Sequence, residues 1–109
     1  MKERSLFIEF MGDSPTVRIF DYLITEGELD FSITDMAENA GVGRSTLYRI
    51  WDGLIENNII IHTRDIGKAK LFKLNAKDQR IKKLIEIYDM LVLDELKKKV
   101  EEQKLEIVA

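Results

Sequence analysis

The 109-residue chain contains no cysteine and only one histidine, one proline and one tryptophan. The absence of cysteine excludes disulfides, thiolate metal ligands and a cysteine nucleophile. A zinc site built almost entirely from carboxylates would be uncommon. A Ser-His-Asp triad would have to use His62, which lies in an isoleucine-rich stretch typical of a strand. We therefore expect no catalytic residues, no metal and no cofactor, and we interpret His62 as a bystander on a strand face.

The chain also lacks a long apolar run. No stretch approaches the roughly 18 consecutive apolar residues needed to cross a bilayer. The N-terminal segment MKERSLFIEFMG is interrupted by Glu9, which is unlike a secretory signal. With 45% hydrophobic and 34% charged residues, the composition is typical of a folded domain with its own core. We expect a cytoplasmic protein with no membrane segment.

Hydrophobic periodicity and cap residues predict two helices in the first forty residues. The first begins at Pro15, a favourable first-turn residue, and ends at Gly27. The short apolar segment 29–31 is a possible strand. A second helix begins at Ser32, which forms a capping-box pattern with Asp35, and ends before residue 41.

A third helix is predicted from Arg44 to Asn57, with Asn58 as a left-handed cap. Its apolar positions fall on one face, at Leu47, Ile50, Trp51 and Leu54. The β-prone runs IIIHTR and AKLFKLN then flank the turn DIGK, a pattern that predicts a hairpin. A long helix follows over 78–104. The predicted order is helix, short strand, helix, tight turn, helix, hairpin, long helix.

The segment FSITDMAENAGVGRSTLYRIWDGLIENNII resembles the winged helix-turn-helix of bacterial and archaeal transcription regulators. GDSPTVRIFDYLI resembles the first helix of the small ArsR-like members, and TRDIGKAKLFKLN resembles their wing. The turn A-x-x-A-G-V followed by S-T-x-x-R is the most specific part. The chain departs from the family at Gly43, where serine is frequent, and in having no thiol for metal sensing.

The resemblance implies a mainly α (α+β) fold, in which a three-helix core carries a β-hairpin wing. It places a winged-helix DNA-binding domain with an N-terminal extension in residues 1–76 and a C-terminal dimerisation helix in residues 77–109. The most similar members are small archaeal winged-helix proteins, and the implied partner is double-stranded DNA.

Polar side chains at the start of the third helix are the candidates for DNA contact, because the N-terminal residues of a recognition helix reach base edges in the major groove. They are Arg44, Ser45, Thr46, Tyr48 and Arg49. On the wing, the candidates are Arg64, Lys68 and Lys70. The alternative for each is an ordinary solvated surface, and lysines on strand edges also deter aggregation. Tyr48 either reaches a phosphate or packs flat on the domain.

The charge distribution favours this interpretation, although the net charge is −3. Residues 1–39 carry three basic and nine acidic side chains, whereas residues 40–83 carry ten basic and four acidic ones. Residues 84–109 carry four basic and seven acidic side chains. The positive charge is therefore concentrated in the predicted recognition helix, the wing and the start of the last helix, where a polyanion would bind.

The last helix is predicted to be about 40 Å long at ~1.5 Å per residue, longer than a winged-helix body covers. Its apolar stripe is too wide to leave in water. Part of it should pack on its own domain, and the rest should pair with a second copy. The predicted dimer-interface residues are Ile81, Leu84, Ile85, Tyr88, Leu91, Val92 and Leu96. The N-terminal LFIEF is a possible addition to this interface, and a purely intramolecular helix is the alternative.

These features predict a homodimeric, sequence-specific regulator of transcription that binds a pseudopalindromic operator. Two alternatives remain open, a winged-helix module that binds protein and an architectural DNA-binding protein with little sequence preference. An enzyme is the least supported class, because no nucleophile, base or metal cluster is evident.

Overall fold

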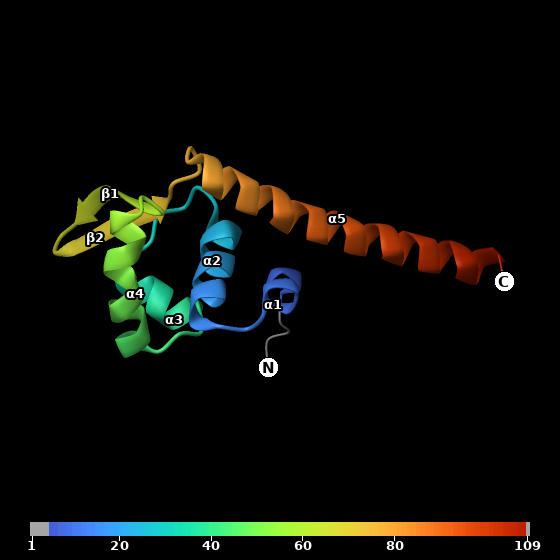
Figure 1. The fold of residues 1–109 in the computed structure, drawn as a ribbon, viewed down its shortest axis with the longest axis horizontal. Helices are drawn as coiled ribbons and strands as arrows, with labels where there is room; N and C mark the ends of the chain where they lie inside the picture. Colours follow the sequence, from blue (N-terminus) through green and yellow to red (C-terminus); the bar gives the residue numbers. More distant parts are fainter. Residues whose placement is uncertain (1–4, 109) are drawn as a thin grey trace.

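A computed structural model describes residues 5–108, with side chains described through residue 105. Its elements are the helices α1 (Leu6–Met11), α2 (Pro15–Glu26), α3 (Ile33–Asn39) and α4 (Arg44–Glu56), the strands β1 (Ile60–Ile66) and β2 (Ala69–Leu74), and the helix α5 (Gln79–Val108). The first six elements gather at one end of the molecule, and α5 projects away from them (Figure 1), so the molecule measures 60 × 31 × 24 Å.

Side-chain caps fix where α2 and α3 begin. Ser14 Oγ accepts a hydrogen bond from the Val17 amide at 3.2 Å, just ahead of Pro15. Ser32 Oγ accepts from the Asp35 amide at 3.1 Å, and the Asp35 carboxylate accepts from the Ser32 amide at 2.9 Å. Each pair satisfies backbone donors that have no partner inside the helix. The capping box predicted from the sequence is therefore confirmed.

The wing is an antiparallel hairpin in which Ile60 pairs with Leu74 and Ile66 pairs with Ala69. The predicted four-residue turn was too long, because Gly67 adopts a positive φ of 60° and closes the hairpin in two residues. The register shifts between positions 62 and 64, where β1 has a bulge. The predicted strand at 29–31 is one bridge, between Phe31 and Phe72.

The core lies where α2, α3 and α4 meet the inner face of the hairpin. Its completely buried side chains include Ile19, Leu23, Met36 and Leu47. Two aromatic contacts join elements that are distant in sequence. The Tyr22 and Phe31 rings lie 5.6 Å apart, and the Trp51 and Phe72 rings lie 5.1 Å apart, both edge to face. Each geometry stabilises an aromatic pair beyond simple burial.

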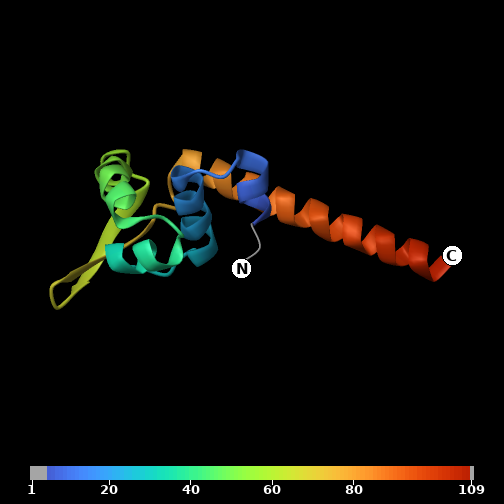
Figure 2. The same cartoon turned by 90° about the horizontal axis from the view of Figure 1, so that it is seen from below.

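The N-terminal helix α1 was not predicted as a helix, because it has only six residues. Ser5 caps it by accepting from the Ile8 amide at 3.1 Å, and its hydroxyl donates to Asp21 Oδ1 of α2 at 2.7 Å. Phe7 is buried, with its ring 5.8 Å from that of Tyr88 in α5. The extension therefore packs between α2 and α5 of its own chain (Figure 2).

The long helix α5 divides into a packed part and a projecting part. Ile81 is 2% exposed and belongs to the core. Tyr88 Oη lies 3.3 Å from Thr25 Oγ1 of α2. Beyond this point the helix extends into solvent (Figures 1 and 2) with a row of apolar side chains that are 50 to 70% exposed, namely Met90, Leu93, Leu96, Val100 and Leu105.

Candidate nucleic-acid interface

The turn between α3 and α4 is held by one arginine from α2. The Arg18 guanidinium donates to Gly41 O at 2.7 Å and to both carboxylate oxygens of Asp13, at 2.6 and 2.8 Å. Gly41 has φ 72°, and a Cβ there would lie 3.3 Å from Arg18 Nη1. The turn thus depends on a glycine and a charged cross-link. The hydrogen bond to Asp13 raises the pKa of Arg18, which keeps it a cation.

Helix α4 is fixed to the domain by its apolar face. Leu47, Trp51 and Leu54 are buried, as the sequence predicts, and Ile50 is half-buried. Gly43 is the N-cap and supplies no side-chain hydrogen bond to the first turn. The amides there remain available to a phosphate or another acceptor.

The opposite face of α4 is directed to solvent. Arg44, Ser45, Tyr48 and Arg49 are exposed, and Thr46 is half-buried. Tyr48 is 54% exposed, so its ring does not pack flat against the domain. The Arg49 guanidinium is 3.4 Å from Thr46 Oγ1. The structure therefore brings together, on one helix, the side chains that the sequence analysis selected.

Three further side chains on this face were missed by the sequence analysis. Asp52, Ile55 and Glu56 follow Tyr48 and Arg49 at helical spacing, and all three are exposed, Ile55 at 40%. The same 3.6-residue period that identified the other exposed positions of this helix would have identified these as well.

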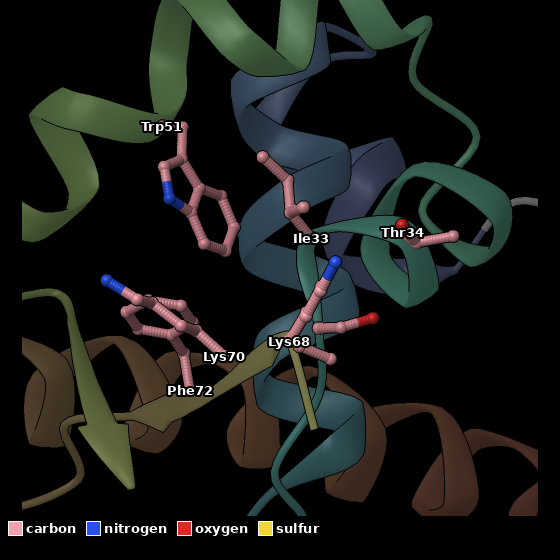
Figure 3. A pocket seen from close by; sticks show the side chains of 8 residues that line it. Ile33, Thr34, Trp51, Lys68, Lys70 and Phe72 are labelled. Atoms are coloured by element: carbon pink, nitrogen blue, oxygen red, sulfur yellow. The ribbon is translucent and has the colours of Figure 1, made fainter. Parts of the chain in front are cut away.

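A groove of about 390 Å³ lies between α3, α4 and β2. Trp51 and Phe72 contribute aromatic rings to it, Thr34 lies at the start of α3, and Lys68 and Lys70 come from the hairpin (Figure 3). Neither lysine forms an ion pair with any residue of the described part of the chain. These two wing cations therefore lie close to the helix-turn-helix.

Arg64, the third predicted wing contact, is placed differently. Its Nε donates to Asp30 Oδ2 at 2.8 Å and its Nη2 to Asp30 Oδ1 at 3.3 Å, while Thr63 Oγ1 donates to Asp30 Oδ2 at 2.9 Å. These hydrogen bonds lower the pKa of Asp30. Lys73 similarly lies 3.3 Å from Glu28. The acidic segment 28–30 thus neutralises part of the wing's positive charge.

His62 lies on an exposed strand face, and its Nε2 is 2.7 Å from Asp65 Oδ1. Its ring is 5.5 Å from that of Phe72. The sequence analysis did not foresee this pairing, which depends on the bulge in β1 to bring residues three positions apart onto the same side.

Arg80 connects the start of α5 to the end of α4. Its guanidinium donates to Asn57 O at 2.6 Å and to Asp78 Oδ2 at 2.9 Å. The hydrogen bond from Arg80 lowers the pKa of Asp78 to about 2. Asp78 Oδ1 also accepts from the Arg80 amide at 2.8 Å and so caps α5. No sequence signal identified this link.

The predicted dimer-interface residues separate into two groups. Ile81 is buried in the core of its own chain, because α5 packs on the domain at this level, and it is not available to a partner in this conformation. Leu84 and Ile85 are half-buried against the same core, and Tyr88 contacts α1 and α2. In the projecting part, Leu91 is half-buried and Val92 and Leu96 are exposed.

No helix in residues 5–108 combines the length and apolar character needed to cross a membrane. The same part of the chain contains no cluster of three or more histidine, aspartate or glutamate side chains suited to a metal ion.

Comparison with solved structures identifies the fold. The structure of NadR in complex with 4-hydroxyphenylacetate has a TM-score of 0.61 at 16% identity, over 94% of this chain and 73% of NadR. MepR, a transcription regulator of the Staphylococcus aureus multidrug efflux pump MepA, has a TM-score of 0.57 at 18% identity, over 88% of this chain and 68% of MepR. The adhesin competence repressor AdcR from Streptococcus pyogenes has a TM-score of 0.56 at 16% identity, over 84% of this chain and 72% of AdcR.

No protein-family model matches the sequence, and no curated protein matches it. The structural neighbours are winged-helix transcription regulators, so the winged helix-turn-helix fold with a long C-terminal helix is confirmed. The narrower resemblance to small archaeal, ArsR-like members remains a prediction.

Proposed function

We propose that this protein is a sequence-specific, double-stranded DNA-binding regulator of transcription that acts as a homodimer on a pseudopalindromic site. The observation that carries the proposal is the two-faced character of α4. Its apolar face is locked into the core, and its opposite face presents Ser45, Tyr48 and Arg49 to solvent. A helix held in this way can enter the major groove without moving relative to its domain.

The residues have the chemistry that this role requires. The Arg49 guanidinium is suited to bidentate hydrogen bonds with a guanine, and the hydroxyls of the first turn are suited to phosphate or base-edge contacts. Lys68 and Lys70 supply cations beside the same helix-turn-helix. Because Arg64 is held by Asp30, the wing contributes fewer free cations than its sequence suggests.

The projecting part of α5 supports the homodimer. Leu93, Leu96 and Val100 recur at three- and four-residue spacing, and no described part of the chain covers them. A second copy of the same helix is the simplest partner for such a stripe. A two-fold dimer would place two α4 helices on successive turns of DNA, about 34 Å apart.

Selection from a random duplex DNA pool tests the proposal. We expect the wild-type protein to enrich an inverted repeat. Arg49→Ala should bind that site about 10- to 100-fold more weakly, because a loss of affinity of this size corresponds to one good bidentate base contact. Lys98→Ala, which removes an exposed cation from the side of distal α5 away from Leu93 and Leu96, is the matched control and should select the same site.

Other outcomes favour the alternatives. Salt-sensitive binding by the wild type without a consensus would favour an architectural protein. No binding to any duplex would contradict DNA binding altogether and favour a protein-binding module, in which exposed apolar residues would matter and Arg49 would not.

Sedimentation tests the dimer separately. The chain has a mass of 12.7 kDa, and we expect the wild type to sediment as twice that mass. The double variant Leu93→Glu, Leu96→Glu should be monomeric while keeping its helical circular dichroism, because both side chains project into solvent. Lys98→Glu is the control for added negative charge. A monomeric wild type would contradict the homodimer.

A further inference from the structure

Asp52 occupies an unexpected place on α4. The helical period puts it on the same face as Ser45 and Tyr48, seven and four residues earlier. Its side chain is exposed, as theirs are. If this face enters the major groove, as the proposed function requires, then a carboxylate enters with it.

No cation neutralises Asp52 in the described part of the chain, where it forms neither an ion pair nor a side-chain hydrogen bond. Arg49 is three positions away, a spacing at which ion pairs form on helices. Its guanidinium instead lies against Thr46. The carboxylate therefore remains available to a ligand outside the chain.

A free carboxylate in the major groove is repelled by phosphates on both sides, and an amino donor on a base edge is the DNA group that compensates it. Among the bases, cytosine N4 and adenine N6 are amino donors in this groove. Adenine also presents the acceptor N7 directly beside N6, which repels a carboxylate. Cytosine presents no acceptor of its own there, and an aspartate accepting from cytosine N4 is the matching pair.

We infer that Asp52 is a specificity-determining residue that selects a cytosine beside the base pair contacted by Arg49. This inference rests on the proposed function. Residues three positions apart on a helix are separated by about 4.5 Å along its axis, and successive base pairs are separated by about 3.4 Å. The separation along the helix exceeds one base-pair step, so the two contacts are placed on neighbouring base pairs.

Parallel selections with three variants test the inference. The wild type should enrich cytosine at one position of each half-site. Asp52→Ala should lose that preference by about tenfold while keeping the other positions. Asp52→Asn should change the preference to adenine, because an amide pairs with adenine N6 and N7. Glu9→Gln is the control for charge, since it removes one exposed negative charge from α1, away from the face of α4 that carries Asp52. It should leave every base preference unchanged.

The possible failures are distinguishable. If both Asp52 variants keep the wild-type consensus and bind every duplex more tightly, then Asp52 only weakens binding through its charge and the inference is wrong. If the wild type enriches no site at all, the proposed function itself fails. Because Asp52 is exposed, the variants should fold, and circular dichroism will verify this.

Discussion

Replacing Gly41 with alanine should destabilise the protein through the turn that orients α4. Its φ of 72° lies in the left-handed region, which costs an L-residue roughly 1–2 kcal/mol. The added Cβ would also lie 3.3 Å from Arg18 Nη1, so the guanidinium must shift and its hydrogen bond to Gly41 O will weaken, which costs about 0.5–1 kcal/mol more. The lower entropy of the unfolded alanine chain offsets about 0.4–1 kcal/mol. We expect a net loss of about 1–2 kcal/mol.

Thermal unfolding followed by circular dichroism measures this effect. A loss of that size corresponds to a fall in Tm of roughly 5–10 °C for a chain of this length. Protein concentration must be matched, because dimerisation changes the apparent stability. Gly43→Ser is the control two residues further on, where φ is −62° and no atom lies within 4 Å of a built Cβ. It should gain a few tenths of a kcal/mol by capping α4. A Gly41→Ala protein as stable as the wild type would refute this account of the turn.

Three further predictions concern single contacts. Asp30→Asn should release Arg64 for DNA, so the slope of log K against log salt should steepen by about 0.9; an unchanged slope in a salt titration would show that the released arginine does not reach DNA. The hydrogen bond from Arg80 lowers the pKa of Asp78 from 3.8 to about 2, so this carboxylate's contribution to stability is complete above its unfolded pKa and is lost as the pH falls through 2. The difference in urea-unfolding free energy between wild type and Asp78→Asn should therefore shrink between pH 4 and pH 2, and a constant difference would contradict the assignment. Phe7→Ala should lower the free energy of unfolding by about 3 kcal/mol, because a buried aromatic ring leaves a cavity; an unchanged Tm would mean that α1 does not contribute to the fold.

Local signals in the sequence predicted most of the fold. Ser32 with Asp35 located the start of α3, and the left-handed Asn58 was expected and is observed at φ 56°. The apolar stripe of α4 was predicted from its period alone. Each of these features depends on residues within one or two helical turns, which is why a single sequence is sufficient.

Contacts between distant residues were not predictable in the same way. Arg18 bonds Gly41, 23 positions away, and Arg64 bonds Asp30, 34 positions away. Neither pair has a spacing that marks it in the sequence. The Arg64 pair changes the functional interpretation, because a cation assigned to DNA is already neutralised within the chain.

The helices at the two ends of the chain, α1 and α5, were the least well predicted. Helix α1 has six residues, too few for a periodic pattern to separate from a loop. In α5 the apolar stripe and its division into a packed and a free part were predicted, but the position of the boundary was not. The periodicity is the same for Ile81, which is buried in the core, and for Leu96, which projects into solvent. Only the position of the domain against the helix distinguishes them.

The central claim is that α4 and the wing lysines form the surface that binds DNA. Amide chemical-shift mapping, with an isotope-labelled protein titrated with the selected duplex, tests it most directly. The account predicts the largest shifts in residues 44–52 and at Lys68 and Lys70, with little change in α5 beyond Leu93. Shifts concentrated in α1 and distal α5, with those of α4 unmoved, would contradict it.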